Sequence, residues 1–576
     1  MSTNIQEMSA PVKKVPIHLQ SSQNRLLIKH GKVVNAHEII DTDVYIEDGI
    51  IKELGKNLII PGGTRILDVR GMYILPGGID PHTHFAFEKS GMKSADDFYQ
   101  GTKAAIAGGT TMIMDFVFPE SGESLVEAFY LRRNAADGQV CCDYSLHACV
   151  TWWSEEVKKE MEELCNKHGI NSFKMFMAYK NEYMLNDCNL YSAFDTCKEL
   201  GAIPMVHAEN GDIIDQNVKK LLSEGVTGPE GHAISRPEII EAEAVNRACV
   251  IANQVKGPVY IDGLTSKRAA DILAPYREEN KVIGAVMASS LGIDIISSSF
   301  STVTDPPLRS HSSLHLIQLL ADGYLQVTGS DDCTYTSEQK SVGKSDFTQI
   351  PAGVNGVEDR MSVIWEKGVE SGAMDPQQFV AITSANAAKI FNIYPQKGCI
   401  AVGSDADIVV WNHRKTRTIS AKTHHQATDV NIFEGMVVHG VPEFVIVNGR
   451  VCFEEGEVKP VQGFGKFIPT LPFPPFIYGS DSDLLMFSNG ESKVDGLKED
   501  KAEGSEKSFS SATEKSDYDM FPDRAAHATG KGARHEGQRN LQESTFSISC
   551  ELDDTSRRSC IRVYNPPGGK SSGSFW

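Results

Sequence analysis

The sequence predicts a (β/α)₈ barrel with a small flanking β-sandwich and a disordered C-terminal tail. Eight short apolar runs alternate with helical patterns across residues 76–395, which favours a barrel over a doubly wound sheet. Short β-type runs broken by turn pairs lie on both sides of this region. After residue 470 the chain is rich in Ser, Gly and charged residues, with too few apolar side chains to offset the entropy of ordering.

These patterns divide the 576 residues into five segments. Pairing of the two β-rich pieces in one sandwich would bring the two ends of the barrel region together. In chain order we expect a flexible N-terminus (1–23), the first part of the sandwich (24–75), the barrel (76–395), the second part of the sandwich (396–470) and the disordered tail (471–576).

Within the β-rich pieces, pairs that contain glycine predict the turns. His30-Gly31, Asp48-Gly49 and Asn448-Gly449 each separate two β-type runs, a spacing typical of tight hairpins. Each barrel strand is predicted by an apolar run. These runs are 72–80, TTMIMDF (110–116), DYSLHACV (143–150), SFKMFMAY (172–179), IPMVHAEN (203–210), PVYIDGL (258–264), VIGAVMA (282–288) and LQVTGSDD (325–332).

Composition and charge narrow the class of protein. A formal net charge of −20 argues against a nucleic-acid groove, which needs clustered cations. No apolar run approaches the ~18 residues of a membrane-spanning helix, and the first residues contain no apolar segment typical of a signal peptide. The 12 cysteines are scattered without a CxxC pair. We therefore expect a reduced, soluble, cytoplasmic protein that neither binds nucleic acid nor inserts into membranes.

The stretch GGIDPHTHF (77–85) places His82 and His84 two residues apart. Alternate residues of a β-strand point to the same face, so the two imidazoles are expected to face one direction, as in the beginning of a metal site. For an isolated His-x-His pair, ordinary hydrogen bonding is the more common explanation. The metal interpretation gains support because other predicted strands also end in ligand-type residues, and active sites of this fold collect at the C-terminal ends of strands.

Three further residues extend this candidate metal site. Lys174 lies in an apolar strand, where burial lowers the pKa of an amine and allows carbamate formation with carbon dioxide; a lysine that reaches solvent is the alternative. His207 ends the next predicted strand, and Asp331 ends the eighth. Two histidines, a lysine carbamate, a third histidine and an aspartate would suit zinc.

With these residues in place, the chain resembles the dihydropyrimidinase and collapsin response mediator protein family of the cyclic amidohydrolases, which are TIM-barrel proteins. The resemblance covers roughly residues 24–470. It implies a hydroxide held between two zinc ions that attacks the ring amide of a dihydropyrimidine. It rests on GGIDPHTHF, GTKAAIAGGTTMIMDF, NSFKMFMAYK, VHAENG, GPEGHAISRPE, GVEDRMSVIWEKGV and GSDADIVVWN.

The resemblance also implies roles for individual residues. One metal would be held by His82, His84, Asp331 and a carboxylated Lys174, and the second by Lys174 and His207 with a third ligand. Asp331 would relay the proton to the leaving nitrogen, and Tyr179 would polarise the scissile carbonyl. Backbone groups at Ser290 and Asn355 would hold the ring.

The chain departs from the enzyme pattern at three positions, and the first of them weakens the second metal. Gly263 stands where the enzymes have a histidine ligand, and strand alternation points Asp262 to the opposite face unless Gly263 forms a bulge. Asp332 follows Asp331 where the enzymes have histidine, and Val286 stands where they typically have an acidic residue. The expected cofactor is therefore zinc, with a single ion as one alternative. Gly263→His is expected to restore part of a lost activity.

The tail favours the mediator branch of the family. NLQESTFSIS and PPGGKSSG resemble the C-terminal extension of collapsin response mediators, which keep the barrel, generally lack hydrolase activity and act on tubulin and the neuronal cytoskeleton. We expect a non-catalytic regulator of the cytoskeleton and of nervous system development, assembled as a homotetramer or as a hetero-oligomer with relatives. The alternative is a zinc-dependent dihydropyrimidinase of pyrimidine catabolism. Gly263 and the tail favour the regulator.

Overall fold

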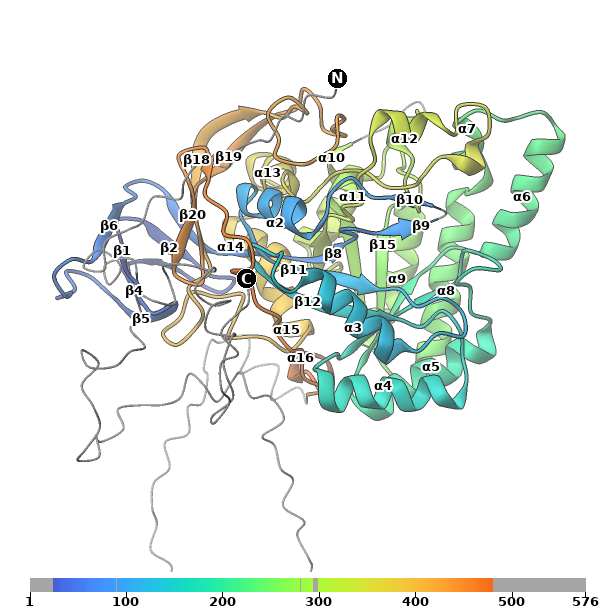
Figure 1. Ribbon diagram of the computed structural model, residues 1–576, viewed down its shortest axis with the longest axis horizontal. Coiled ribbons are helices and arrows are strands. Elements are labelled where there is room, and N and C mark those ends of the chain that lie inside the picture. Colours follow the sequence, from blue (N-terminus) through green and yellow to red (C-terminus); the bar gives the residue numbers. More distant parts are fainter. Residues whose placement is uncertain (1–23, 90, 280, 294–298, 480–576) are drawn as a thin grey trace, which may run out of the picture. The chain divides into compact units, whose positions relative to one another are not determined.

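The computed structural model describes residues 24–479 except 90, 280 and 294–298 (Figure 1). The N-terminus (1–23) and almost all of the predicted disordered tail (471–576) lie outside the described residues. Within the described part of the chain, no helix is both long enough and apolar enough to cross a membrane.

Eight parallel strands form the barrel, each paired with the next in chain order. The first and eighth strands meet through the backbone, because the Asp331 N–H donates to the His82 carbonyl (3.0 Å) and the His84 N–H donates to the Asp332 carbonyl (2.9 Å). The predicted (β/α)₈ barrel is confirmed. Its strands are β8 (Gly78–Thr83), β11 (Thr110–Val117), β12 (Asp143–Cys149), β13 (Ser172–Phe176), β14 (Ile203–His207), β15 (Val259–Leu264), β16 (Val282–Met287) and β17 (Val327–Gly329).

Helices follow the strands and pack outside the barrel (Figure 1). Several begin at a side-chain cap: the Ser154 hydroxyl accepts the N–H of Val157, and Asn186 accepts that of Asn189. The helices that these residues begin end at Gly169 and Gly201, whose φ angles of +68° and +66° favour glycine. The helices between the strands are α2 (Phe98–Ala107), α3 (Leu125–Ala136), α4 (Glu155–His168), α5 (Asp187–Leu200), α6 (Gly211–Ser223), α7 (Glu230–Ser235), α8 (Glu238–Val255), α9 (Lys267–Glu279), α10 (Ala288–Gly292) and α11 (Ser313–Ala321).

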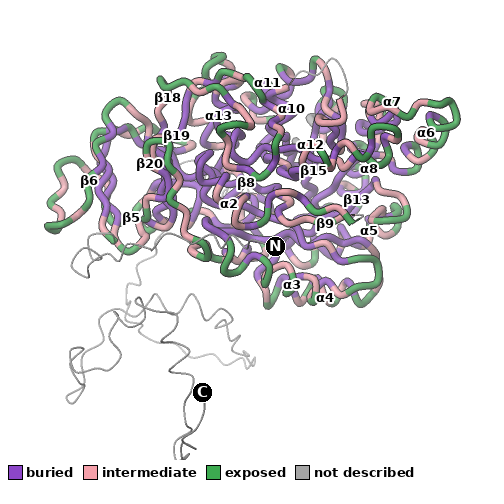
Figure 2. Tube along the Cα trace, turned by 45° about the horizontal axis from the view of Figure 1, so that its top comes forward, coloured by how far each residue is buried: buried purple, intermediate pink, exposed green. Residues whose placement is uncertain are grey.

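Shorter elements lie in the loops between barrel strands and in the chain that follows β17. Buried residues follow the barrel strands, whereas the outer helices such as α4 and α6 are exposed along one side (Figure 2). The remaining elements are the helices α12 (Ser337–Ser341), α13 (Arg360–Ile364), η3 (Trp365–Glu370), α14 (Pro376–Val380), η4 (Ala381–Ala385), α15 (Asn386–Ile390) and α16 (Pro475–Tyr478), the short turns η1 (Phe300–Thr302) and η2 (Phe347–Gln349), and the ribbon of β9 (Glu88–Lys89) and β10 (Met92–Lys93).

The two β-rich pieces share one seven-stranded sheet, as predicted for a single sandwich. In this sheet β7 pairs antiparallel with β18, which joins strands from the two ends of the described chain. Apolar residues of this sheet and of the four-stranded sheet form one buried cluster. The first sheet has the order β21 (Glu457–Val458), β20 (Arg450–Glu454), β19 (Val437–Val447), β18 (Ile408–Thr418), β7 (Tyr73–Pro76), β2 (Lys32–Val34) and β3 (Ile39–Asp41), and the second has the order β5 (Ile50–Gly55), β4 (Asp43–Glu47), β1 (Arg25–Lys29) and β6 (Arg65–Asp68).

Two local predictions are confirmed and two are wrong. Asp48-Gly49 and Asn448-Gly449 do form two-residue hairpins. His30-Gly31 does not, because β1 and β2 belong to different sheets. The run 72–80 is two strands, one in the sandwich and one in the barrel, separated at Gly77. A Cβ at Gly77 would lie 1.9 Å from the Thr111 hydroxyl oxygen, so the chain passes there only without a side chain. The predicted segment boundaries stay predictions.

A buried lysine joins the barrel to the sandwich. The Lys397 ammonium lies 2.5 Å from the Asp143 carboxylate of β12 and 3.0 Å from Asp405, and it also contacts Asp407. Burial alone would lower the pKa of Lys397, but the three carboxylates hold it well above its usual value. Lys397 therefore supplies the counter-charge for a cluster of carboxylates from both parts of the chain.

Replacing Lys397 by methionine is expected to lower the free energy of unfolding by about 3–5 kcal/mol, because three carboxylates would lose their buried counter-charge. Denaturant unfolding measures the effect. The matched control is Lys415→Met, since Lys415 pairs with Glu443 (3.2 Å) but is 47% exposed, and its loss should change stability by about 1 kcal/mol or less. Equal effects of the two substitutions would contradict the role given to Lys397.

Candidate functional site

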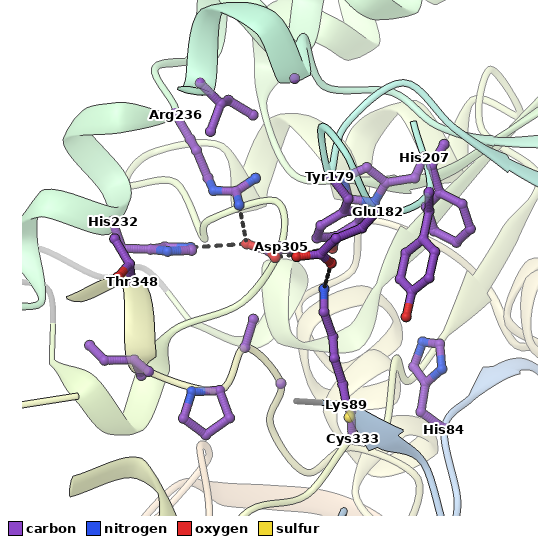
Figure 3. Close-up of a pocket in the computed structure, with 18 of the residues that line it drawn as sticks. His84, Lys89, Tyr179, Glu182, His207, His232, Arg236, Asp305, Cys333 and Thr348 are labelled. Atoms are coloured by element: carbon purple, nitrogen blue, oxygen red, sulfur yellow. Dashed lines mark hydrogen bonds and ion pairs between the residues drawn. The ribbon is translucent and has the colours of Figure 1, made fainter. Parts of the chain in front are cut away.

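A cavity of about 500 Å³ lies at the C-terminal ends of the barrel strands (Figure 3). Strand ends from β8, β13 and β14 supply part of its wall, and the loops that follow them supply the rest. The cavity collects most of the candidate residues of the sequence analysis, although their roles stay predictions. Those that line it are His82, His84, Lys174, Tyr179, His207 and Asp331.

Three of these side chains are close enough to share one metal ion. The ligand atoms of His82, His84 and Asp331 all lie within 4.8 Å of one another. The His82 Nε2 atom is 2.9 Å from the His84 Nε2 atom and 3.1 Å from the Asp331 carboxylate. His82 lies in β8 and His84 directly follows the last residue of this strand, and Asp331 adopts a φ of +54° just after β17. Two imidazoles and a carboxylate fit a zinc ion.

Charged neighbours shift the pKa values of these groups. Burial alone would lower the pKa of His82, but the carboxylates of Asp262 and Asp331 raise it to about 9. Burial opposes ionisation of Asp331, yet His82 and His84 hold the pKa of this carboxyl well below its usual value. The group therefore carries the anionic carboxylate that metal binding requires.

Asp262 lies inside the site, where alternation did not place it. Its carboxylate is 2.9 Å from the His82 Nδ1 atom and contacts the Lys174 ammonium directly. The pairing of β14 with β15 puts Asp262 opposite His207, on the inner face. Gly263 has a φ of +82°, and the register of β15 with β16 shifts between Ile261 and Leu264. The bulge named as the exception is present, but the pairing of β14 with β15 is regular up to Asp262, which shares the inner face with Tyr260 by ordinary alternation; the default expectation for Asp262 is wrong.

The surroundings of Lys174 do not fit a second metal. Its buried ammonium contacts Asp262 and lies 5.4 Å and 5.7 Å from the ring centroids of Phe116 and Phe176. Although burial would raise the pKa of Asp262, His82 and Lys174 hold it well below its usual value. Carboxylation would replace this cation with an anion against a buried carboxylate, which low-dielectric surroundings strongly disfavour. Gly263 supplies no ligand in compensation.

His207 has a carboxylate partner from its own segment. Its Nε2 atom lies 2.8 Å from the buried Glu209 carboxylate, which also accepts a hydrogen bond from Arg236 (2.8 Å). His207 is outside the group formed by His82, His84 and Asp331. Glu209 was not predicted as a site residue, although its position two residues after His207 could have indicated that it faces the same side.

A second carboxylate holds Tyr179. The Tyr179 hydroxyl donates to the Asp305 carboxylate (3.0 Å), whose other oxygen lies 3.1 Å from the His232 Nε2 atom and 3.4 Å from Arg236 (Figure 3). Burial and the Asp305 charge raise the pKa of Tyr179 well above its usual value, so the hydroxyl keeps its proton. In the sequence, the segment that contains His232 and Arg236 supported only the family resemblance, and no pattern pointed to Asp305.

The remaining sequence candidates lie away from the cavity wall. Ser290 is buried in α10, and the Asn355 side-chain oxygen accepts the Ile432 N–H (2.7 Å); neither is among the residues that line the cavity. Asp332 turns away from the site and accepts the N–H groups of Gly356 (2.7 Å) and Val357 (3.0 Å). The ring-binding roles of Ser290 and Asn355 stay predictions.

Comparisons with known proteins agree on one family. Residues 73–452 match the amidohydrolase family. The chain is 57% identical to the dihydropyrimidinase of Rattus norvegicus over 79% of this chain and 91% of that protein. It is 45% identical to dihydropyrimidinase-related protein 5 of Mus musculus over 96% of this chain and 99% of that protein. The crystal structure of dihydropyrimidinase from Brevibacillus agri NCHU1002 matches with a TM-score of 0.77 and 39% identity, over 78% of this chain and 99% of that one.

The metal site leads to a direct prediction. After equilibration with zinc, the protein is expected to hold about one ion per chain. Among the described residues, His82, His84 and Asp331 bring imidazole and carboxylate ligands together, whereas the carboxylates of Asp143, Asp405 and Asp407 are already paired with Lys397. His84→Ala should weaken zinc binding at least about tenfold, whereas His207→Ala should leave it unchanged. Elemental mass spectrometry of the dialysed proteins measures both. Two zinc ions per unaltered chain would contradict the site as described.

Proposed function

Because the chain belongs to the amidohydrolase family, in the branch that contains dihydropyrimidinases and dihydropyrimidinase-related proteins, we propose that it is a non-catalytic member. It serves as a cytoplasmic regulator of the cytoskeleton in nervous system development. The observation that carries the proposal is the buried contact between Asp262 and Lys174.

The contact removes the group on which two-metal hydrolysis depends. A bridging hydroxide needs two ions to lower its pKa and to stabilise the charge that develops during attack. The second ion would be left with His207, since Gly263 has no side chain and the Lys174 ammonium is neutralised by Asp262. His207 itself is hydrogen-bonded to Glu209. A single zinc ion at His82, His84 and Asp331 would supply Lewis-acid chemistry there.

The group expected to polarise a substrate carbonyl is also engaged. The Tyr179 hydroxyl has one proton, and it donates that proton to Asp305 at 3.0 Å. A ligand carbonyl in the cavity would have to compete with a carboxylate for this donor. Charge-assisted hydrogen bonds of this kind are about twice as strong as those between neutral groups. The chain thus directs three groups, on Lys174, His207 and Tyr179, toward its own carboxylates.

The proposed regulatory role is supported by the relative that aligns over almost the whole chain. Dihydropyrimidinase-related protein 5 aligns over 96% of this chain, which includes the region beyond the barrel and sandwich, whereas the rat enzyme aligns over 79%. By resemblance, the partners are tubulin and other cytoskeletal proteins, and the assembly is a homotetramer or a hetero-oligomer with relatives. The barrel then acts as a scaffold on which the assembly is built.

Dihydropyrimidinase activity is the second candidate function. The complete group of His82, His84 and Asp331 favours it, as does the 57% identity to the rat enzyme. In that case Asp331 and Tyr179 would act on a dihydropyrimidine ring held in the cavity.

Hydrolysis of dihydrouracil distinguishes the two candidates. The unaltered protein is expected to hydrolyse dihydrouracil poorly or not at all. Asp262→Val combined with Gly263→His should raise the rate by about 10–100-fold over this residual level, or over the detection limit, through a restored second metal. Gly263→His alone should restore less than first expected from the sequence. It leaves Lys174 paired with Asp262, and it forces a histidine into a φ of +82°.

The controls are Asp262→Val alone and the zinc content of every variant. A rate gain without a second zinc ion would point to a different cause. If the unaltered protein opens the ring at an ordinary enzymatic rate, on the order of 1–1000 per second, the non-catalytic proposal is wrong and the hydrolase takes its place.

A further inference from the structure

A lysine of this chain reaches into the cavity from the β9–β10 ribbon. The Lys89 ammonium lies 4.3 Å from the centroid of the Tyr179 ring and 5.2 Å from that of the Tyr183 ring. It also forms an ion pair with the Glu182 carboxylate at 2.8 Å (Figure 3). Two aromatic faces and a carboxylate therefore surround one ammonium group.

This combination is what recognises an organic cation. The face of a tyrosine ring carries partial negative charge, and it attracts an ammonium within about 6 Å of the ring centre. The Asp305 carboxylate accepts a hydrogen bond from the Tyr179 hydroxyl, which adds electron density to the same ring. Lys180, which lines the same cavity and is 32% exposed against 29% for Lys89, is held differently: its ammonium pairs with the carboxylates of Asp212 (2.7 Å) and Asp215 (3.6 Å).

We infer that the cavity contains a subsite for a primary ammonium group, formed by Tyr179, Tyr183 and Glu182, and that Lys89 occupies it as a built-in ligand. The ligands of this subsite are small alkylamines. Because Lys89 is tethered, its effective concentration is in the millimolar range, so a free amine displaces it only above that range. A neutral cyclic amide that displaced Lys89 from the subsite would leave the Glu182 carboxylate without its positively charged partner. The inference is independent of the metal site and goes beyond the proposed function.

Calorimetric titration of the full-length chain with n-butylammonium chloride tests the subsite. Lys89→Ala should bind the amine at least about tenfold more tightly than the unaltered protein, because the subsite is then vacant. Adding Glu182→Gln to Lys89→Ala should remove this gain. Lys93→Ala, which removes a cation from the exposed side of the same ribbon, should bind as the unaltered protein does.

A neutral probe separates ammonium recognition from the space that the substitution creates. n-Butanol should bind Lys89→Ala no more tightly than the unaltered protein. Equal gains for n-butanol and n-butylammonium would overturn the inference, and so would a gain that survives Glu182→Gln.

A second measurement needs no change at Lys89. In the unaltered protein, reductive methylation followed by peptide mass spectrometry should modify Lys89 at least about tenfold more slowly than Lys93, the exposed lysine of the same ribbon. Glu182→Gln should accelerate modification of Lys89 alone. Equal rates at the two lysines in the unaltered protein would overturn the inference even if Lys89→Ala failed to fold.

Discussion

The Asp262 carboxylate, buried between the Lys174 ammonium and His82, determines what the rest of the cavity can do. A charge removed from water is tolerated only beside an opposite charge, so this carboxylate requires cations on both sides. It contacts the Lys174 ammonium directly, and together with Asp331 it raises the pKa of His82 to about 9. An anionic lysine carbamate at the same place would face a like charge. Binding of a second metal ion therefore depends on Asp262, which is paired with Lys174, and on Gly263, which has no side chain to act as a ligand.

The barrel makes such an arrangement possible because its parallel strands end at one place. Lys174, His207 and Asp262 come from three successive strands, and the backbone register brings them to the same inner face. Around them the chain places Glu209 against His207 and Asp305 against Tyr179. Lys174, His207 and Tyr179, for which the resemblance implied functional roles, are thus each paired with a carboxylate of this chain. Outside the cavity, Lys397 fulfils a related role for the carboxylates between barrel and sandwich.

Much of the fold follows from the sequence, because period and turn chemistry are local properties. All eight barrel strands were predicted, as were the hairpins at Asp48-Gly49 and Asn448-Gly449. The hairpin predicted at His30-Gly31 is wrong because a turn pair does not specify which strands pair with each other. The two strands in run 72–80 were merged because the change of sheet at Gly77 depends on a close approach to Thr111 that lies far along the chain.

The candidate site was only partly predictable, for physical reasons. His82 and His84 are two residues apart at the end of one predicted strand, so alternation predicts that they face the same way, and Asp331 follows from its strand end. The inward position of Asp262 depends on the register that β15 adopts against β14, and Asp305 lies on a loop with no periodic pattern. Pairing between buried charges depends on distances that only the folded chain sets.

The chemical state of Lys174 tests the account most directly. Carbon-13 NMR of the full-length protein, equilibrated with ¹³C-bicarbonate and zinc, reports a lysine carbamate as a distinct carbonyl resonance, and Lys174→Met identifies its origin. The account predicts no resonance that this substitution removes, because the amine remains an ammonium paired with Asp262. A carbamate resonance in the unaltered protein that disappears in Lys174→Met would contradict it.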